Sequence, residues 1–184
     1  MKTKQRTALS VDQRLARDRT VAYHDARALA LELACGLPST RFDPMAAGVV
    51  LKPGETVYRE LPIWLRVQQD GWWAGASFAD VFVTDQRLLC RFATGRLSLL
   101  WWSGVVGLNV DLAAEHIVLD YGDGQPVGLS GTHVAPISVA AIASIYGARA
   151  LVGHRALAPL RGDGPWHRRV GDLHAPKEPA LART

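Results

Sequence analysis

The clearest pattern in the chain is an alternation of apolar and polar residues between positions 56 and 131. Turn residues interrupt this alternation every eight to twelve positions, a spacing typical of all-β structure. Neighbouring side chains of a strand point to opposite faces, so one face of each strand is predicted to be buried and the other to face solvent. We predict seven strands, near residues 56–67, 76–84, 87–93, 97–102, 105–112, 116–121 and 126–130.

The breaks between these strands have the chemistry of turns. They include Gln-Asp-Gly at 69–71, Thr-Asp-Gln at 84–86, Thr-Gly at 94–95 and Asp-Gly at 123–124. Asp-Gly between two alternating runs is a strong hairpin signal, because both residues tolerate positive φ. We therefore expect antiparallel strands joined by short turns.

A long helix is predicted before the strands. Ser10 and Gln13 match a capping box, in which each side chain accepts a hydrogen bond from the backbone of the other residue. Strong helix formers continue to Cys35, Gly36 suits the left-handed position after a helix, and Pro38 prevents continuation. One apolar stripe contains Leu15, Ala22, Ala26, Leu29 and Leu33. We expect the second half of this helix to pack on the domain and the arginine-rich first half to project.

A second helix is predicted from His133 to Gly147, with Pro136 in its first turn. It is apolar on two faces, so we expect it to be largely buried. The predicted fold class is α+β: a seven-stranded antiparallel barrel or sandwich, capped by this C-terminal helix and preceded by the long N-terminal helix. The expected organisation is an N-terminal basic helix (1–41), a linker (42–54), a β-rich domain (55–157) and a flexible C-terminal tail (158–184).

Length and composition fit a globular protein. The 184 residues, 48% of them hydrophobic and 21% charged, can form one domain with appendages, and global disorder is excluded. No apolar run approaches the roughly 20 residues that span a bilayer, and the basic N-terminus has no apolar segment behind it. We therefore expect a cytoplasmic protein without a transmembrane segment. Cys35 and Cys90 lie far apart and are interpreted as reduced, mostly buried thiols.

The net charge of +4 is concentrated at the two ends. Residues 1–41 carry +4, residues 42–160 carry −2, and residues 161–184 carry +2. This distribution argues against a nucleic-acid clamp on the folded body. It leaves the ends as solubilising segments or as weak contacts to phosphates or an acidic partner.

Three stretches resemble the bacterial pleckstrin-homology (PH)-like and GRAM-like domains. Leu51-Lys52-Pro53-Gly54-Glu55 is similar to the L-x-x-G-E opening of that family, and residues 81–89 (VFVTDQRLL) are similar to its T-(D/N)-x-R hairpin. Residues 101–112 resemble the region that follows. The resemblance covers about residues 49–157 and implies the predicted fold and a binding role, with no reaction. The Trp-Trp pairs and residues 1–41 have no counterpart in the family.

Catalytic motifs are not apparent. The six histidines show no HxH or HExxH spacing, the serines form no G-x-S-x-G elbow, and no P-loop precedes a helix. Asp120 and Asp123 flank a turn and are interpreted as turn-forming acids rather than as an acid–base pair. We therefore expect no enzyme activity, no metal site and no cofactor.

Two tryptophan pairs are candidate binding residues: Trp72 with Trp73, and Trp101 with Trp102. In a strand, one member of each pair faces the core and the other faces outward. An outward tryptophan is a common anchor of a binding surface. The alternative is that the N-terminal helix covers this face of the sheet.

Arg87, Arg91 and Arg96 bracket one hairpin and are the second set of candidate binding residues. A solvated face, a phosphate pocket and a protein contact are all compatible with three arginines near Asp80 and Asp85. We interpret the chain as a non-catalytic protein-interaction (adaptor or scaffold) module that binds a protein partner or self-associates. The alternative is an anion-binding domain that contacts phospholipid headgroups or nucleic acid through its basic ends and these arginines.

Overall fold

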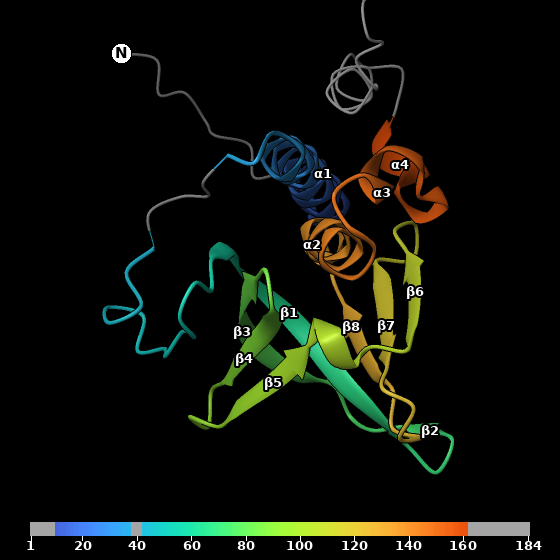
Figure 1. The fold of residues 1–184 in the computed structure, drawn as a ribbon. Helices are drawn as coiled ribbons and strands as arrows, with labels where there is room; N and C mark the ends of the chain where they lie inside the picture. Colours follow the sequence, from blue (N-terminus) through green and yellow to red (C-terminus); the bar gives the residue numbers. More distant parts are fainter. Residues whose placement is uncertain (1–9, 38–41, 162–184) are drawn as a thin grey trace, which may run out of the picture.

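A computed structural model of the protein describes residues 10–37 and 42–161 (Figure 1). Its elements, in chain order, are α1 (Val11–Cys35), β1 (Val57–Gln69), β2 (Trp72–Trp73), β3 (Ser77–Thr84), β4 (Arg87–Phe92), β5 (Leu97–Trp101), the 3-10 helix η1 (Trp102–Gly104), β6 (Gly107–Asp111), β7 (His116–Asp120), β8 (Val127–Ser130), α2 (Val134–Tyr146), α3 (Ala150–Gly153), the 3-10 helix η2 (Arg155–Leu157) and α4 (Ala158–Arg161).

The strands form one open antiparallel sheet in the order β5-β4-β3-β1-β8-β7-β6, with β2 paired to β1. The long strand β1 pairs with β3 and β8, and so joins the meander β1-β3-β4-β5 to the meander β6-β7-β8. This confirms the α+β class, and all seven predicted strands are present with ends within two residues. The extra strand β2 and the early end of β5 at Trp101 were not predicted.

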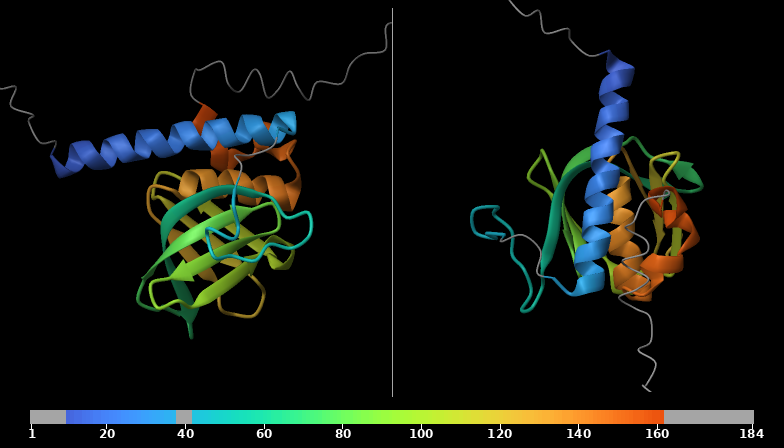
Figure 2. Two further views of the ribbon diagram at one scale, coloured as in Figure 1. Left: turned by 90° about the vertical axis from the view of Figure 1, so that its left-hand side faces the viewer. Right: turned by 90° about the horizontal axis from the view of Figure 1, so that it is seen from above.

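The core lies between the inner face of the sheet and α2. Every α2 residue from Val134 to Ile142 is buried, because the sheet covers one side of this helix and α1 covers the other (Figure 2). Leu61, Ile63 and Leu65 of β1 are among the inner-face residues that pack in the same cluster. The prediction that α2 is buried because it is apolar on two faces is therefore confirmed.

The N-terminal helix begins and ends as predicted. Ser10 Oγ accepts a hydrogen bond from the backbone N–H of Gln13, Gln13 Oε1 accepts one from Ser10, and Gly36 adopts a φ of 62°. Ala22, Ala26, Leu29 and Ala30 are buried beside α2, while residues 10–21 are exposed and extend past the body (Figure 2). Leu15, the first member of the predicted stripe, is exposed.

Two segments expected outside the β-rich domain pack against the folded body. The segment expected to be a linker packs on the outer face of the sheet, where Phe42 and Val49 contact Phe82 and Leu89. Residues 158–161 of the segment expected to be a flexible tail form α4, and Leu160 is fully buried. The predictions for residues 1–9, for Pro38 and for residues 162–184 lie outside the described residues. Among the helices of the described ranges, none has the length and apolar character needed to span a membrane.

Candidate functional site

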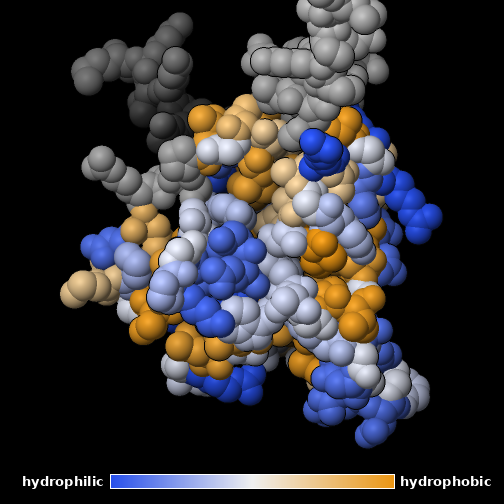
Figure 3. All heavy atoms as spheres, viewed as in Figure 1, coloured by the Kyte–Doolittle hydropathy of each residue, from blue (hydrophilic) through white to orange (hydrophobic). Residues whose placement is uncertain are grey.

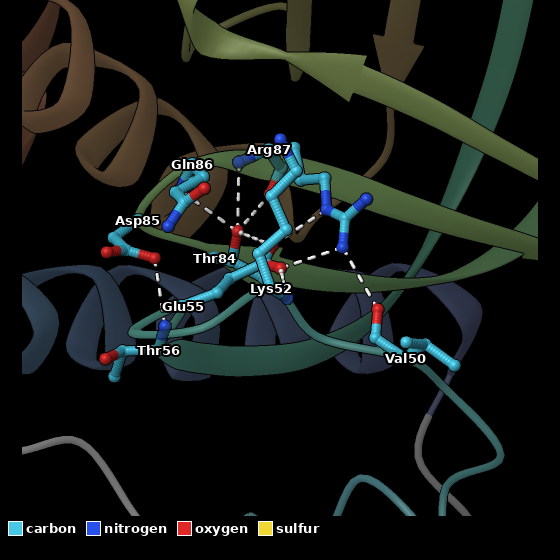
Figure 4. Close-up of polar contacts among 8 residues, drawn as sticks. All are labelled: Val50, Lys52, Glu55, Thr56, Thr84, Asp85, Gln86 and Arg87. Carbon is cyan, nitrogen blue, oxygen red and sulfur yellow. Dashed lines mark hydrogen bonds and ion pairs between the residues drawn. The ribbon is translucent and has the colours of Figure 1, made fainter.

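The first predicted binding arginine, Arg87, is a buried structural residue. Its Nε and Nη2 atoms each donate a 2.8 Å hydrogen bond to the Glu55 carboxylate, and Nη2 also donates to the Val50 carbonyl (Figure 4). The side chains of Arg87 and Glu55 are 7% and 0% exposed. This ion pair neutralises the guanidinium inside the protein, so Arg87 is not available to a phosphate.

Thr84 completes this buried cluster. Its hydroxyl donates to Glu55 Oε1 over 2.8 Å and accepts from the backbone N–H of Arg87 (Figure 4). Burial alone raises the pKa of Glu55, but the hydrogen bonds from Arg87, the Lys52 backbone and Thr84 outweigh it and lower the pKa below 4.5. Glu55 is the last residue of the L-x-x-G-E stretch, and Thr84 and Arg87 belong to the T-D-x-R stretch. Two separate sequence motifs therefore meet in one buried, hydrogen-bonded cluster.

The other two predicted arginines differ in their surroundings. Arg91 donates a 2.7 Å hydrogen bond to the Ala47 carbonyl and lies 3.6 Å from Glu60 and 3.7 Å from Asp80. Arg96 is exposed, lies over the Phe92 ring, and forms no ion pair with any residue of the described ranges. Arg96 alone of the three keeps an unpaired charge.

The second tryptophan pair divides between core and surface, as predicted. Trp102 is 4% exposed and its Nε1 donates a 2.9 Å hydrogen bond to the Thr84 carbonyl. Trp101 is half-buried, with Lys52 Nζ 4.1 Å and Arg87 Cζ 4.5 Å from its ring centroid. Trp102 lies in η1 and not in a strand, so the chain turn at η1, rather than strand alternation, carries it into the core.

The prediction for the first pair is wrong, because Trp72 and Trp73 are both exposed. They form β2, a two-residue strand on the connection from β1 to β3, which does not cover the core. Trp73 packs against the edge of His116, 6.2 Å between ring centroids, and under the guanidinium of Arg66. Gly128 makes room for it, since a Cβ at this position would lie 3.1 Å from the Trp73 ring.

Two further aromatic residues of the surface were missed. Trp64 of β1 and Phe78 of β3 are cross-strand partners with ring centroids 5.3 Å apart. The signal was present, because Trp64 has the opposite parity to Leu61, Ile63 and Leu65 in the same strand. Trp64 and His116 both pair with Ser130, so the Trp64–Phe78 pair and the Trp73–His116 pair lie close together on the outer face. We call Trp64, Trp73 and Phe78 the aromatic patch. Trp72 pairs with Gln69 of β1 and therefore points to the opposite face from Trp73.

The aromatic patch is not covered by the N-terminal helix. α1 packs on α2, and Arg59 of β1 joins it through ion pairs of 2.7 Å to Asp25 and 2.9 Å to Glu32. The alternative in which this helix covers the tryptophans is therefore wrong. The exposed fractions of the three patch residues are 48% for Trp64, 37% for Trp73 and 46% for Phe78, and Trp72 on the opposite face is 81% exposed.

The surface as a whole has several apolar areas. Figure 3 shows separate hydrophobic areas between hydrophilic ones on the side that carries β4 and β5. A groove of about 400 Å³ lies there between residues 48–52 and strands β4 and β5. Within the described ranges, no three His, Cys, Asp or Glu side chains are grouped so that they could hold a metal ion.

Comparison with protein-family models gives no match for this chain, and comparison with curated proteins also gives none.

Proposed function

We propose that the protein is a non-catalytic protein-interaction module whose residues 49–157 form a PH-like domain. The strand order supports the family proposal: β1 joins two antiparallel meanders by pairing with β3 and β8, and the long helix α2 follows the last strand and packs over the inner face of the sheet. The meeting of the two family-like motifs at Glu55, Thr84 and Arg87 supports it as well.

The aromatic patch is the observation that carries the interaction role. Large aromatic side chains at an exposed position are costly to keep in water, and tryptophan is enriched among the residues that dominate binding energy. Three such side chains lie on the outer face of β1 and of the two strands paired with it, β2 and β3, and each is at least 37% exposed. A partner that buries them gains apolar contact area without displacing any part of the described fold.

The alternative, anion binding by the hairpin arginines, has weaker support. Arg87 is neutralised by Glu55, and Arg91 is shared among a carbonyl and two carboxylates. On the basic half of α1, Arg19 pairs with Glu115. The rest of the basic ends lies largely outside the described residues. Of the hairpin arginines, only Arg96 forms no ion pair with a described residue. Arg96 and Arg66 line one cavity.

Affinity capture from a lysate of the native host, at low and high salt, tests this proposal. The bait is the full chain, compared with Trp64→Ala and Trp73→Ala, and Val106→Ala is the control because it removes an exposed apolar side chain elsewhere. We expect a stoichiometric protein partner that survives high salt and is retained by the control. Its affinity should fall at least about 30-fold in a tryptophan variant, the effect of losing an anchor worth about 2 kcal/mol.

Two results contradict the proposal. Capture of nucleic acid or anionic lipid alone, lost at high salt, would favour the anion-binding alternative, because phosphate contacts weaken steeply with ionic strength. A protein partner that binds both tryptophan variants as tightly as the wild type would remove the aromatic patch from the binding surface.

A further inference from the structure

Strand β5 leaves one edge of the sheet open. It pairs with β4 on one side, and no described strand pairs with its other side. The backbone N–H of Phe92 donates to the Arg96 carbonyl, and that of Trp102 donates to the Gln86 carbonyl. These two hydrogen bonds show which residue pairs of β4 and β5 are hydrogen-bonded. Hydrogen bonding alternates along an antiparallel strand, so Ser98 and Leu100 bond to β4. The backbone groups of Leu97, Leu99 and Trp101 therefore point away from the sheet.

Apolar surface lies on both sides of this edge. On the outer face, Leu97 and Leu99 are 50% and 43% exposed and line the 400 Å³ groove together with Val50. Along the edge itself, a cavity of about 380 Å³ separates Leu99 and Leu100 from Tyr121 and Val127. A strand added to β5 would therefore find apolar contacts for side chains on both of its faces.

Each end of β5 carries a cation. Lys52 lies at the Trp101 end of β5, and Arg96 precedes Leu97 at the other end. Neither cation forms an ion pair with a residue of the described ranges. Two acids lie nearby, Asp123 in the edge cavity and Asp85 in a cavity that it shares with Lys52 and Trp101. Their carboxylates accept hydrogen bonds from the backbone N–H groups of Gln125 and Thr56. The edge is thus complementary to a segment that carries acidic residues.

We propose that β5 binds an extended, apolar segment of a partner protein that is flanked by acidic residues, and that this segment adds as a further strand of the sheet. Backbone hydrogen bonds to Leu97 and Leu99 give it affinity, and Lys52 and Arg96 select its acidic flanks. This is a second surface, separate from the aromatic patch, and it rests on the proposed function only in that the partner is a protein.

Charge also disfavours a second copy of this chain as the occupant. Antiparallel pairing of two β5 strands places Arg96 of each copy beside Lys52 of the other. Like charges directly opposite each other destabilise a strand pair. A separate protein with acidic residues meets no such repulsion.

Amide hydrogen exchange of the full chain, followed residue by residue by NMR, tests whether the edge is free. We expect the Ser98 and Leu100 amides to be protected and the Leu97 and Leu99 amides to exchange rapidly, independent of protein concentration. Slow exchange at Leu97 and Leu99 in dilute protein would mean that a segment of the same chain occupies the edge. Protection that rises with concentration would mean that a second copy does. Either result overturns the proposal.

Selection from a phage-displayed library of random 12-residue peptides tests the partner chemistry. We expect enriched peptides with an alternating apolar centre and acidic flanks, which slow exchange at Leu97 and Leu99 when bound. A selected peptide with alternate backbone nitrogens methylated should bind at least about tenfold more weakly, because it loses strand hydrogen bonds. No enrichment, enrichment of basic peptides, or full binding by the methylated peptide would overturn the proposal.

A pair of variants assigns the binding to the edge. Leu99→Pro removes an outward N–H while leaving every hydrogen bond between β4 and β5 in place, and Leu99→Val keeps that N–H. The selected peptide should lose about tenfold in affinity with Leu99→Pro and bind Leu99→Val within about threefold. Circular dichroism checks that both variants are folded. The methylated peptide removes strand hydrogen bonds from the peptide side, so it tests the same contact with the wild-type chain unchanged. Trp64→Ala, which tests the proposed function, should leave this peptide's affinity unchanged.

Discussion

Replacing Glu55 by glutamine should destabilise the protein strongly. Wild-type Glu55 forms two 2.8 Å hydrogen bonds with Arg87, and both side chains are almost completely buried. Glutamine has nearly the same shape but no charge, and its amide group turns N–H donors toward a guanidinium that has only donors. The Glu55→Gln variant therefore leaves a buried, uncompensated cation.

The cost follows from the burial. Removing one partner of a buried ion pair typically costs about 3–5 kcal/mol, against about 0–1 kcal/mol for an exposed pair. For a chain of this size, about 2–4 °C per kcal/mol gives a drop in Tm of roughly 6–20 °C. The pKa of Glu55 is lowered in the folded state, so its contribution is complete above about pH 4.5 and is lost as the pH falls below that value. The difference between wild type and variant should narrow in acid.

Urea unfolding, followed by tryptophan fluorescence and circular dichroism, measures this difference. Glu60→Gln is the matched control, because Glu60 is 50% exposed and lies 3.6 Å from Arg91 on the surface. It should change the free energy of unfolding by less than about 1 kcal/mol. The reasoning is refuted if Glu55→Gln costs no more than Glu60→Gln, or if its cost is independent of pH between 7 and 3.

Three further predictions concern the helix contact, the thiols and one histidine. Arg59→Ala should loosen α1, because it removes the partly buried cation that pairs with two acids of that helix. We expect the free energy of unfolding to fall by about 1–3 kcal/mol and amide exchange in the second half of α1 to become faster, and unchanged exchange would contradict this. Cys35 is exposed, whereas burial raises the pKa of Cys90 to about 12, so one thiol per chain should react with Ellman's reagent at pH 8 and the second only after unfolding. Two reactive thiols in the native protein would be evidence against the buried position of Cys90. Burial, and then the charge of Arg66, lower the pKa of His116 below 6.5, so the unfolded state binds more protons and the free energy of unfolding should fall as the pH drops below 6.5. For His116→Gln, urea unfolding should show a smaller fall of this free energy between pH 6.5 and 5, and a fall equal to that of the wild type would count against this assignment.

Local chemistry made most of the elements predictable. The capping box at Ser10 and Gln13, the left-handed Gly36 and the Asp123-Gly124 turn each act within a few residues, and each appears in the structure as predicted. β2 was not foreseen, because a pair of tryptophans in a connection has the same composition as a pair in a strand.

The candidate site was less predictable, because its residues depend on contacts that are distant in sequence. Arg87 was expected among binding residues, and only the fold shows that Glu55, 32 positions earlier, neutralises it. The outward position of Trp64 could be predicted from the alternation of side chains in its strand. Its pairing with Phe78 could not, because it depends on the register between β1 and β3. The free edge of β5 is a property of the strand order and cannot be obtained from any one segment.

The sequence by itself determined where helices and strands form and which face of each is apolar, because side-chain period, caps and turn residues are local properties. The tertiary structure decided what those faces meet: α1 lies on α2 and not on the tryptophans, and residues 42–51 lie on the outer face of the sheet. Many pairings of apolar faces would satisfy the same local pattern. Only the complete packing selects one, and with it decides which charges are paired and which aromatic side chains remain exposed.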